Sequence, residues 1–124
     1  SICYDMRFPD LYRALTNAGA TILLAPAAFT VPTGQAHWHV LLRARAIEAG
    51  CFVIATAQVG AHADGRVTYG HSLVVDPWGD VLLDMGEAGG LGLVDIDLTR
   101  LGDVRARVPA IANRRAIPQE VQIS

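Results

Sequence analysis

Hydrophobic residues form two different patterns in the first part of the chain, a helical spacing and a continuous run, and each predicts a different element. Residues 9–18 carry apolar side chains at helical spacing, so we expect a helix that Pro9 opens and Gly19 ends. Four apolar residues would form its buried face: Leu11, Ala14, Leu15 and Ala18. The continuous apolar run over residues 20–25 stops at Pro26 and predicts a strand that is buried on both faces.

The alternation of strand and helix continues through the first half of the chain. A short apolar segment, residues 1–3, ends at Cys3, and we expect these residues to lie inside a further strand. A loop over residues 27–34 precedes a second helix over residues 35–49, and residues 51–57 form the next strand. Strand, helix, strand, helix, strand with short connections predicts right-handed crossovers and a parallel sheet.

A sheet of this kind also predicts where a site would form. Ligands collect outside the carboxyl ends of the strands. Cys3, the loop after Ala25 and the segment after Ala57 should therefore share one edge. Three further side chains would then lie near the sulfur: Arg7, Phe29 and Thr33.

The pattern changes to antiparallel strands in the second half. Residues 63–66 read Ala-Asp-Gly-Arg and predict a surface turn. Residues 71–75 and 81–84 flank the sequence Asp-Pro-Trp-Gly over residues 76–79, in which Pro and Gly suit a type I turn. This arrangement predicts an antiparallel hairpin.

The last part of the chain predicts one more strand and one more helix. Residues 91–96 read as a strand, and Asp97 is a suitable N-cap for a helix over residues 98–107. Residues 110–124 have a weak pattern and are expected to pack on a neighbour or to fray. Together these elements predict an α/β fold in which mixed β-sheets are flanked by helices.

Composition limits the partners and the compartment. The 124 residues, 52% of them hydrophobic, fit one compact domain or a piece of one. A net charge of −2 without a basic cluster argues against nucleic acid or an anionic membrane as a partner. No apolar run approaches the ~20 residues of a membrane span. Two cysteines do not make a disulfide framework, so a reducing cytoplasm is the expected location.

Cys3 is the strongest candidate for chemistry. A cysteine between a strand and a helix has an exposed sulfur, nearby backbone N–H groups and the positive end of the helix within reach. These features favour a thiolate nucleophile and stabilise the oxyanion formed when it attacks a carbonyl. The alternative is that Cys3 is a small buried hydrophobe, as most free cysteines are. Cys51 lies inside a predicted strand and is expected to be a core residue.

Residues 2–11 read Ile-Cys-Tyr-Asp-Met-Arg-Phe-Pro-Asp-Leu and resemble the nucleophile segment of the nitrilase superfamily of carbon–nitrogen hydrolases. Within that superfamily, the amidases that act on deaminated glutathione and on omega-amides of 2-oxo acids are the most similar branch. The resemblance continues in order through seven further segments: 28–30, 33–34, 36–38, 42–48, 69–79, 96–98 and 114–115.

The resemblance implies a fold, a mechanism and a set of site residues. The fold would be an α-β-β-α sandwich, and the catalytic group a Glu-Lys-Cys triad in which Cys3 attacks the amide. The backbone N–H of Tyr4 would be the second oxyanion donor. Arg7 would face the substrate's carboxylate with its planar fork of donors, and Phe29 and Thr33 would line the same pocket. No cofactor would be required, and the protein would be a homodimer or a higher homo-oligomer.

Only the cysteine of that triad falls within the sequence. All ten cationic side chains are arginine, and no glutamate occupies the family's base position. We therefore expect residues 1–124 to be the C-terminal portion of a single carbon–nitrogen hydrolase domain, inactive by itself. Two other functions stay open: hydrolysis of N-carbamoyl amino acids by the same machinery, and a catalytically inert module for folding or dimerisation.

Four histidines raise the possibility of a metal site. His37 and His39 are two residues apart on a predicted helix and point to different faces, and no carboxylate or thiolate stands at ligand spacing. We therefore expect no metal, and we expect His37 with Trp38 to pack and form hydrogen bonds behind the pocket. Four other side chains are assigned structural roles, an ion network for the first three and a place in the core for the last: Arg43, Arg45, Glu48 and Trp78.

Overall fold

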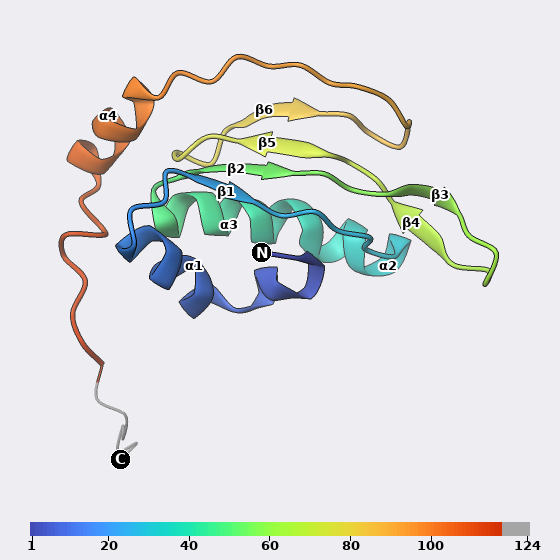
Figure 1. Cartoon of the computed structure of the whole chain (residues 1–124), viewed down its shortest axis with the longest axis horizontal. Coiled ribbons are helices and arrows are strands. Elements are labelled where there is room, and N and C mark those ends of the chain that lie inside the picture. The colour runs from blue at the N-terminus through green and yellow to red at the C-terminus, as the bar shows by residue number, and fades with distance from the viewer. Residues whose placement is uncertain (118–124) are drawn as a thin grey trace.

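The computed structural model describes residues 1–117, in which helices cover one side of a four-stranded sheet (Figure 1). The strand order is β1-β2-β5-β6. β1 and β2 are parallel, and the two other pairs are antiparallel, so the sheet is mixed, as predicted. A separate antiparallel pair, β3 and β4, extends from one end. The strands have these bounds: β1 Ile22–Leu24, β2 Phe52–Ala55, β3 Val59–Ala61, β4 Val67–Tyr69, β5 Leu73–Val75 and β6 Val81–Asp84.

The helices divide between the covered side of the sheet and one of its ends. α1 and α3 lie together beneath the sheet, and α4 lies at the end away from β3 and β4 (Figure 1). None of the helices in the described part of the chain is long and apolar enough to cross a membrane. The helices have these bounds: the 3-10 helix η1 Cys3–Arg7, α1 Pro9–Asn17, α2 Val31–Thr33, the π-helix η2 Gly34–Trp38, α3 His39–Ala49 and α4 Thr99–Arg107.

The predicted strand over residues 1–3 is wrong. Ser1 and Ile2 run beside β1, and the Ser1 amine donates to the Leu24 carbonyl at 3.1 Å. The Asp5 carboxylate accepts a hydrogen bond from the Ile2 N–H at 2.8 Å, and the Asp5 N–H donates back to the Ile2 carbonyl. This reciprocal pair turns the chain into η1 before a strand can form.

The helix predicted over residues 35–49 begins earlier, at Val31. Pro32 explains the early start, because proline suits the first turn of a helix. Consecutive α2, η2 and α3 carry the helix to Ala49, and Gly50 ends it at a φ of 55°. The strand predicted over residues 91–96 is wrong, since that part of the chain has no strand and exposes its leucine side chains.

The buried face of α1 differs from the predicted one. Tyr12 and Thr16 are buried, while Leu11, Ala14 and Ala18 are exposed. The guanidinium of Arg45 from α3 lies 5.7 Å from the centre of the Tyr12 ring, so the α1–α3 contact selects the face that carries the aromatic residue. β1 is likewise buried on one face only, because the side chain of Leu24 is 59% exposed.

Arg45 is the polar centre of the helical layer. Its side chain is buried, donates from Nε to the Met6 carbonyl at 2.8 Å, and pairs with Glu48 at 2.8 Å. This contact ties α3 to η1 and confirms part of the predicted ion network. Arg43 is the exception, since its Nε donates to the Gly79 carbonyl at 2.7 Å instead.

The hairpin formed by β5 and β6 is confirmed, with a turn closed by the Gly79 N–H to the Asp76 carbonyl at 2.9 Å. Trp78 was expected in the core, but it is 39% exposed and lies under the guanidinium of Arg107 at 4.6 Å. The proline before it fills the buried position of the turn, which leaves the tryptophan on the surface.

The segment from Asp97 onwards folds back on the helical layer. Asp97 accepts hydrogen bonds from the N–H and the hydroxyl of Thr99, as expected of a residue that caps α4. Beyond α4, Arg114 donates to the Glu48 carbonyl at 2.9 Å and to the Asn17 side chain at 3.2 Å. The tail up to residue 117 therefore packs on its own chain. Residues 118–124 lie outside the described residues.

Candidate active site

Cys3 lies at an abrupt change of backbone direction. Ile2 is extended, with φ −131° and ψ 122°, and Cys3 itself has a φ of 46°. η1 begins at this residue. Positive φ is uncommon for residues other than glycine and concentrates at functional sites. The side chain is half-buried and packs against the core cluster, so it is neither a wholly buried hydrophobe nor a freely exposed thiol.

Three chain segments meet beside Cys3, at the edge where the sequence predicts a site. The Cys3 N–H donates to the Pro26 carbonyl at 2.8 Å, just beyond β1. The Ala27 N–H donates to the Thr56 carbonyl at 2.8 Å, just beyond β2. The loop after β1 and the segment after β2 line a cavity of about 220 Å³: Pro26, Ala27, Thr56, Ala57 and Gln58.

Tyr4 brings a backbone donor to the same place. Its N–H belongs to the first turn of η1, where helix geometry leaves N–H groups without partners inside the helix. The side chain points outward, is 65% exposed and lies against the Phe8 ring, with 5.8 Å between ring centres. Tyr4 can thus contribute its N–H beside the sulfur, while its ring forms part of the surface.

Arg7 is held between two aromatic rings. Its guanidinium carbon lies 5.3 Å from the centre of the Tyr4 ring and 5.1 Å from that of Phe29. One terminal nitrogen lies 3.3 Å from Nδ1 of His37. Phe29 is buried and meets the Trp38 ring edge-on at 5.1 Å. The structure therefore brings Arg7 and Phe29 together, and the guanidinium is oriented before any ligand arrives.

Thr33 bonds to its near neighbour Thr30. Its hydroxyl lies 3.0 Å from the hydroxyl of Thr30 and donates to the Thr30 carbonyl at 3.1 Å. These bonds close the first turn of α2, next to Phe29 in sequence. The hydrogen bonds of the described residues do not join Thr33 to Arg7.

Cys51 is a core residue, as predicted. Its side chain is completely buried, and its sulfur donates to the carbonyls of Ala20 and Ala49 at 3.2 Å. Of the two cysteines, only Cys3 is accessible to a reagent or a substrate.

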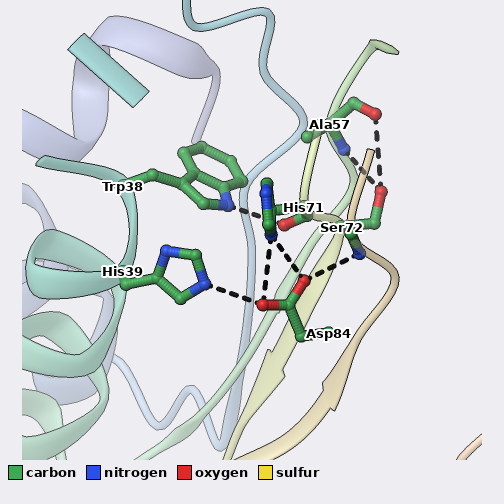
Figure 2. A network of polar contacts seen from close by, with 7 residues as sticks. Trp38, His39, Ala57, His71, Ser72 and Asp84 are labelled. Carbon is green, nitrogen blue, oxygen red and sulfur yellow. Dashed lines mark hydrogen bonds and ion pairs between the residues drawn. The ribbon is translucent and has the colours of Figure 1, made fainter. Parts of the chain in front are cut away.

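A second polar cluster comes from three separate parts of the chain and was missed by sequence reasoning (Figure 2). Nε2 of His39 lies 2.8 Å from Asp84 Oδ2, and Nδ1 of His71 lies 2.9 Å from Asp84 Oδ1. One signal for it was available: residues 71 and 84 both lie near the open end of the predicted hairpin, so the hairpin brings them close, although the register partner of Asp84 is Leu73. His39 is brought in by the tertiary fold alone.

The cluster perturbs the acidity of its carboxylate. Partial burial would raise the pKa of Asp84. Hydrogen bonds from His39, the Gly86 N–H and His71 outweigh that effect, so the pKa of Asp84 lies below its ordinary value. The carboxylate is therefore ionised at neutral pH.

A second cavity, of about 160 Å³, lies between the end of α3, the β5–β6 turn and α4. Its lining is mainly apolar, and its one charged side chain, Arg105, donates to the Gly50 carbonyl at 2.9 Å. It offers hydrophobic contact and no nucleophile. The groups capable of amide chemistry are at the edge that holds Cys3.

Known proteins share both the sequence and the arrangement. Residues 1–106 match the family described as carbon-nitrogen hydrolase. A deaminated glutathione amidase from Synechocystis is 54% identical over 114 residues, which are 92% of this chain and 42% of the relative. The chain thus spans less than half the length of that relative.

Two solved structures of related proteins have a similar fold. Saccharomyces cerevisiae Nit3, described as a member of branch 10 of the nitrilase superfamily, matches 94% of this chain and 43% of its own with a TM-score of 0.85 and 35% identity. An amidase from Nesterenkonia sp. AN1, described with acrylamide added to its active-site cysteine, matches 87% of this chain and 42% of its own with a TM-score of 0.70 and 36% identity. With the family pattern, the close relative and the fold in agreement, the chain belongs to the carbon-nitrogen hydrolase family.

Proposed function

We propose that the protein hydrolyses an amide C–N bond in a small, carboxylate-bearing molecule and that Cys3 is the nucleophile. The observation that carries this proposal is the backbone at Cys3, which turns through a positive φ at the edge where the carboxyl ends of β1 and β2 meet. This position presents a half-buried thiol beside backbone N–H groups. The Nesterenkonia amidase, with its modified active-site cysteine, supports the same chemistry.

The reaction divides into two displacements. A general base takes the Cys3 thiol proton as the sulfur attacks the amide carbon, the carbonyl oxygen becomes an oxyanion, and the Tyr4 N–H donates to it. When the oxyanion collapses, the C–N bond breaks, the same group returns that proton to the nitrogen, and ammonia leaves a thioester. Water, deprotonated by the same group, attacks the thioester, and the C–S bond breaks to release the carboxylic acid and the thiol.

The proposal assigns this chain part of the machinery. Residues 1–124 form the C-terminal portion of one hydrolase domain and supply the nucleophile, one oxyanion donor and the carboxylate site. A glutamate base and a lysine that stabilises the oxyanion belong to the remainder of the domain. The 42% coverage of the Synechocystis relative supports this division.

Arg7 supports a substrate that carries a carboxylate. Guanidinium presents two parallel N–H donors to a carboxylate, and the rings of Tyr4 and Phe29 already orient it. Together with the relative named deaminated glutathione amidase, this favours deaminated glutathione, or an omega-amide of a 2-oxo acid, as the substrate. Thr33 would line the same pocket from α2.

The test compares the two cysteines in the full-length protein. Cys3→Ala should abolish amide hydrolysis, whereas Cys51→Ala should lower stability and leave turnover measurable. Acrylamide or iodoacetamide, followed by peptide mass spectrometry, should label Cys3 well before the buried Cys51. Activity that survives Cys3→Ala, or preferential labelling of Cys51, would overturn the assignment.

The assembly and the division of the machinery are tested separately. We propose that the full-length protein is at least dimeric in the reducing cytoplasm, as the resemblance implies, and light scattering at micromolar concentration measures this. Residues 1–124 alone should not turn over 2-oxoglutaramate or deaminated glutathione, because loss of one oxyanion donor alone costs about 10²–10³ in rate. Turnover by these residues would show that another base, with His37 and His71 the first candidates, serves Cys3.

A further inference from the structure

His39, His71 and Asp84 converge on one point although they are far apart in the sequence. His39 opens α3, His71 precedes β5 and Asp84 ends β6 (Figure 2). One ligand atom from each residue, two imidazole nitrogens and a carboxylate oxygen, lies within 4.8 Å of the others. The spacing of His37 and His39 argues against a metal site on the helix itself, but the fold pairs His39 with a different histidine and a carboxylate.

The backbone holds His71 in place from both sides. Its N–H donates to the Gly86 carbonyl at 2.7 Å, and its carbonyl accepts from the Trp38 indole at 2.7 Å. Its φ is 59°, a conformation that residues other than glycine adopt rarely. The imidazole stacks on the Tyr69 ring, with 4.2 Å between ring centres. The ring is thus fixed where its Nδ1 faces the carboxylate.

The carboxylate is oriented as well. Asp84 Oδ1 accepts from the Gly86 N–H at 2.9 Å, which leaves Oδ2 as the oxygen nearer to His39. Hydrogen bonds of this kind to a ligating carboxylate orient it in metal sites. The cluster is therefore organised by its surroundings and does not depend on the three side chains alone.

The ligand set and the access suit a transition metal. Two imidazole nitrogens and one carboxylate oxygen are the donors that proteins offer to Zn²⁺, usually with a fourth position for water. The side chains of His39, His71 and Asp84 are 33%, 19% and 33% exposed, so an ion can enter from solvent. Tetrahedral ligands about 2.0–2.1 Å from a zinc ion lie about 3.3 Å apart. The present N–O distances of 2.8 and 2.9 Å would widen by about half an ångström.

We propose that His39 Nε2, His71 Nδ1 and a carboxylate oxygen of Asp84 form a binding site for one divalent transition-metal ion of the Zn²⁺ class, with water as a further ligand. Binding requires a lone pair on each ring nitrogen that faces the carboxylate, so the proton of a neutral imidazole moves to its other nitrogen through solvent. The bound ion links the start of α3 to β5 and β6. This site contains none of the residues assigned to the proposed amidase site, and the proposal does not depend on that function.

The experiment uses the untagged full-length protein after Cys3 has been carboxamidomethylated, so that its thiol cannot compete for metal. Zn²⁺ binding is measured by competition with a chromophoric chelator, and Co²⁺ substitution reports the geometry. One equivalent of Zn²⁺ should bind, and thermal unfolding should shift to higher temperature with Zn²⁺. Co²⁺ should give the intense absorption of a four-coordinate site.

Three variants remove one ligand each and preserve the local structure: His39→Gln, His71→Asn and Asp84→Asn. Asparagine tolerates the positive φ at position 71, and at position 84 it can still accept from the Gly86 N–H. Each should weaken Zn²⁺ binding by at least about 10- to 100-fold, the loss typical of changes even around the ligands. His37→Gln and His62→Gln are matched controls that should bind Zn²⁺ as the parent does.

The outcomes separate the possibilities. Three results would overturn the proposal and leave the cluster as a hydrogen-bonded contact. They are failure of the parent to bind Zn²⁺, binding by the ligand variants equal to that of the parent, and loss of binding in a control variant. If one ligand variant does not fold, as circular dichroism would show, the two others decide. Because Cys3 is blocked throughout, none of these results bears on the amidase proposal.

Discussion

Replacement of Arg7 separates substrate recognition from structural support. The guanidinium makes two contacts with aromatic rings, at 5.3 and 5.1 Å from their centres, worth about 0.5–1 kcal/mol each at a partly exposed site. Their loss affects stability alone. A charge-assisted contact with a substrate carboxylate is worth about 1.5–3 kcal/mol. Arg7→Ala should therefore lower kcat/KM by roughly 10- to 150-fold for an amide that carries a carboxylate.

The assay compares two amides in the full-length enzyme: 2-oxoglutaramate and an analogue in which an ester replaces the carboxylate. The loss caused by Arg7→Ala should shrink for the ester, because that substrate has no charge for the arginine to meet. Arg7→Lys keeps the charge but loses the planar fork, so its activity should fall between the parent and the alanine variant. Arg66→Ala is the matched control, since Arg66 is exposed and pairs with its neighbour Asp64.

One result would refute this reasoning. If Arg7→Ala lowers kcat/KM equally for both substrates, the arginine supports the fold around Cys3 and does not recognise the carboxylate. Urea unfolding of the same variants checks that interpretation. A stability loss beyond about 2 kcal/mol would exceed the two aromatic contacts and point to a wider structural role.

Three further predictions concern stability, and urea unfolding measures each. Gly34→Ala should cost about 1–3 kcal/mol of stability, because a Cβ there would overlap the ring of Tyr69 in β4. Gly102→Ala, with open space around it on α4, should be neutral or stabilise by up to about 1 kcal/mol. The reverse order of the two effects would refute this packing. Arg45→Ala should cost about 2–3 kcal/mol of stability, because it breaks the buried contact between α3 and η1. Arg43→Ala breaks a more exposed contact and should cost about 1 kcal/mol. Equal losses in the two variants would contradict this difference. Burial raises the pKa of Tyr12, so its neutral form contributes stability that is fully present below about pH 10 and is lost as pH rises through the folded pKa. Tyr12→Phe should reduce this loss of stability at alkaline pH. An unchanged dependence of the unfolding free energy on pH would argue against a role for Tyr12.

The features that the sequence determines are those set by neighbours within a few residues. Pro9 and Gly19 bound α1, and Asp97 caps α4, because a helix end depends on the local backbone and its unpaired N–H and C=O groups. The Asp-Pro-Trp-Gly turn likewise determines the β5–β6 hairpin without help from the remainder of the chain. Cys3 lies beside the loop after β1, as the rule for parallel strands predicts, although the residues before it run along β1 without forming the predicted strand.

Burial was decided only by the tertiary structure. Tyr12 and Thr16 displaced the predicted apolar face of α1 because Arg45, on a helix much later in the chain, stacks on the tyrosine. Leu91 alternates with glycine in the manner of a strand, yet it is 86% exposed, because alternation makes a strand only where a neighbouring edge supplies hydrogen bonds. Trp78 reached the surface for a similar reason: the proline beside it took the buried position.

The two candidate sites differ in how far they depend on sequence neighbours and how far on the tertiary structure. Cys3, Tyr4 and Arg7 all lie within the short helix η1, so the sequence alone could mark them as a group, although only the fold supplies the ring of Phe29 against the arginine. The cluster at His39 joins the start of α3, the residue His71 that precedes β5, and the end of β6. No local pattern records the arrival of His39 at this cluster, because it depends on how a helix packs across a sheet, and that packing is the sum of many distant contacts.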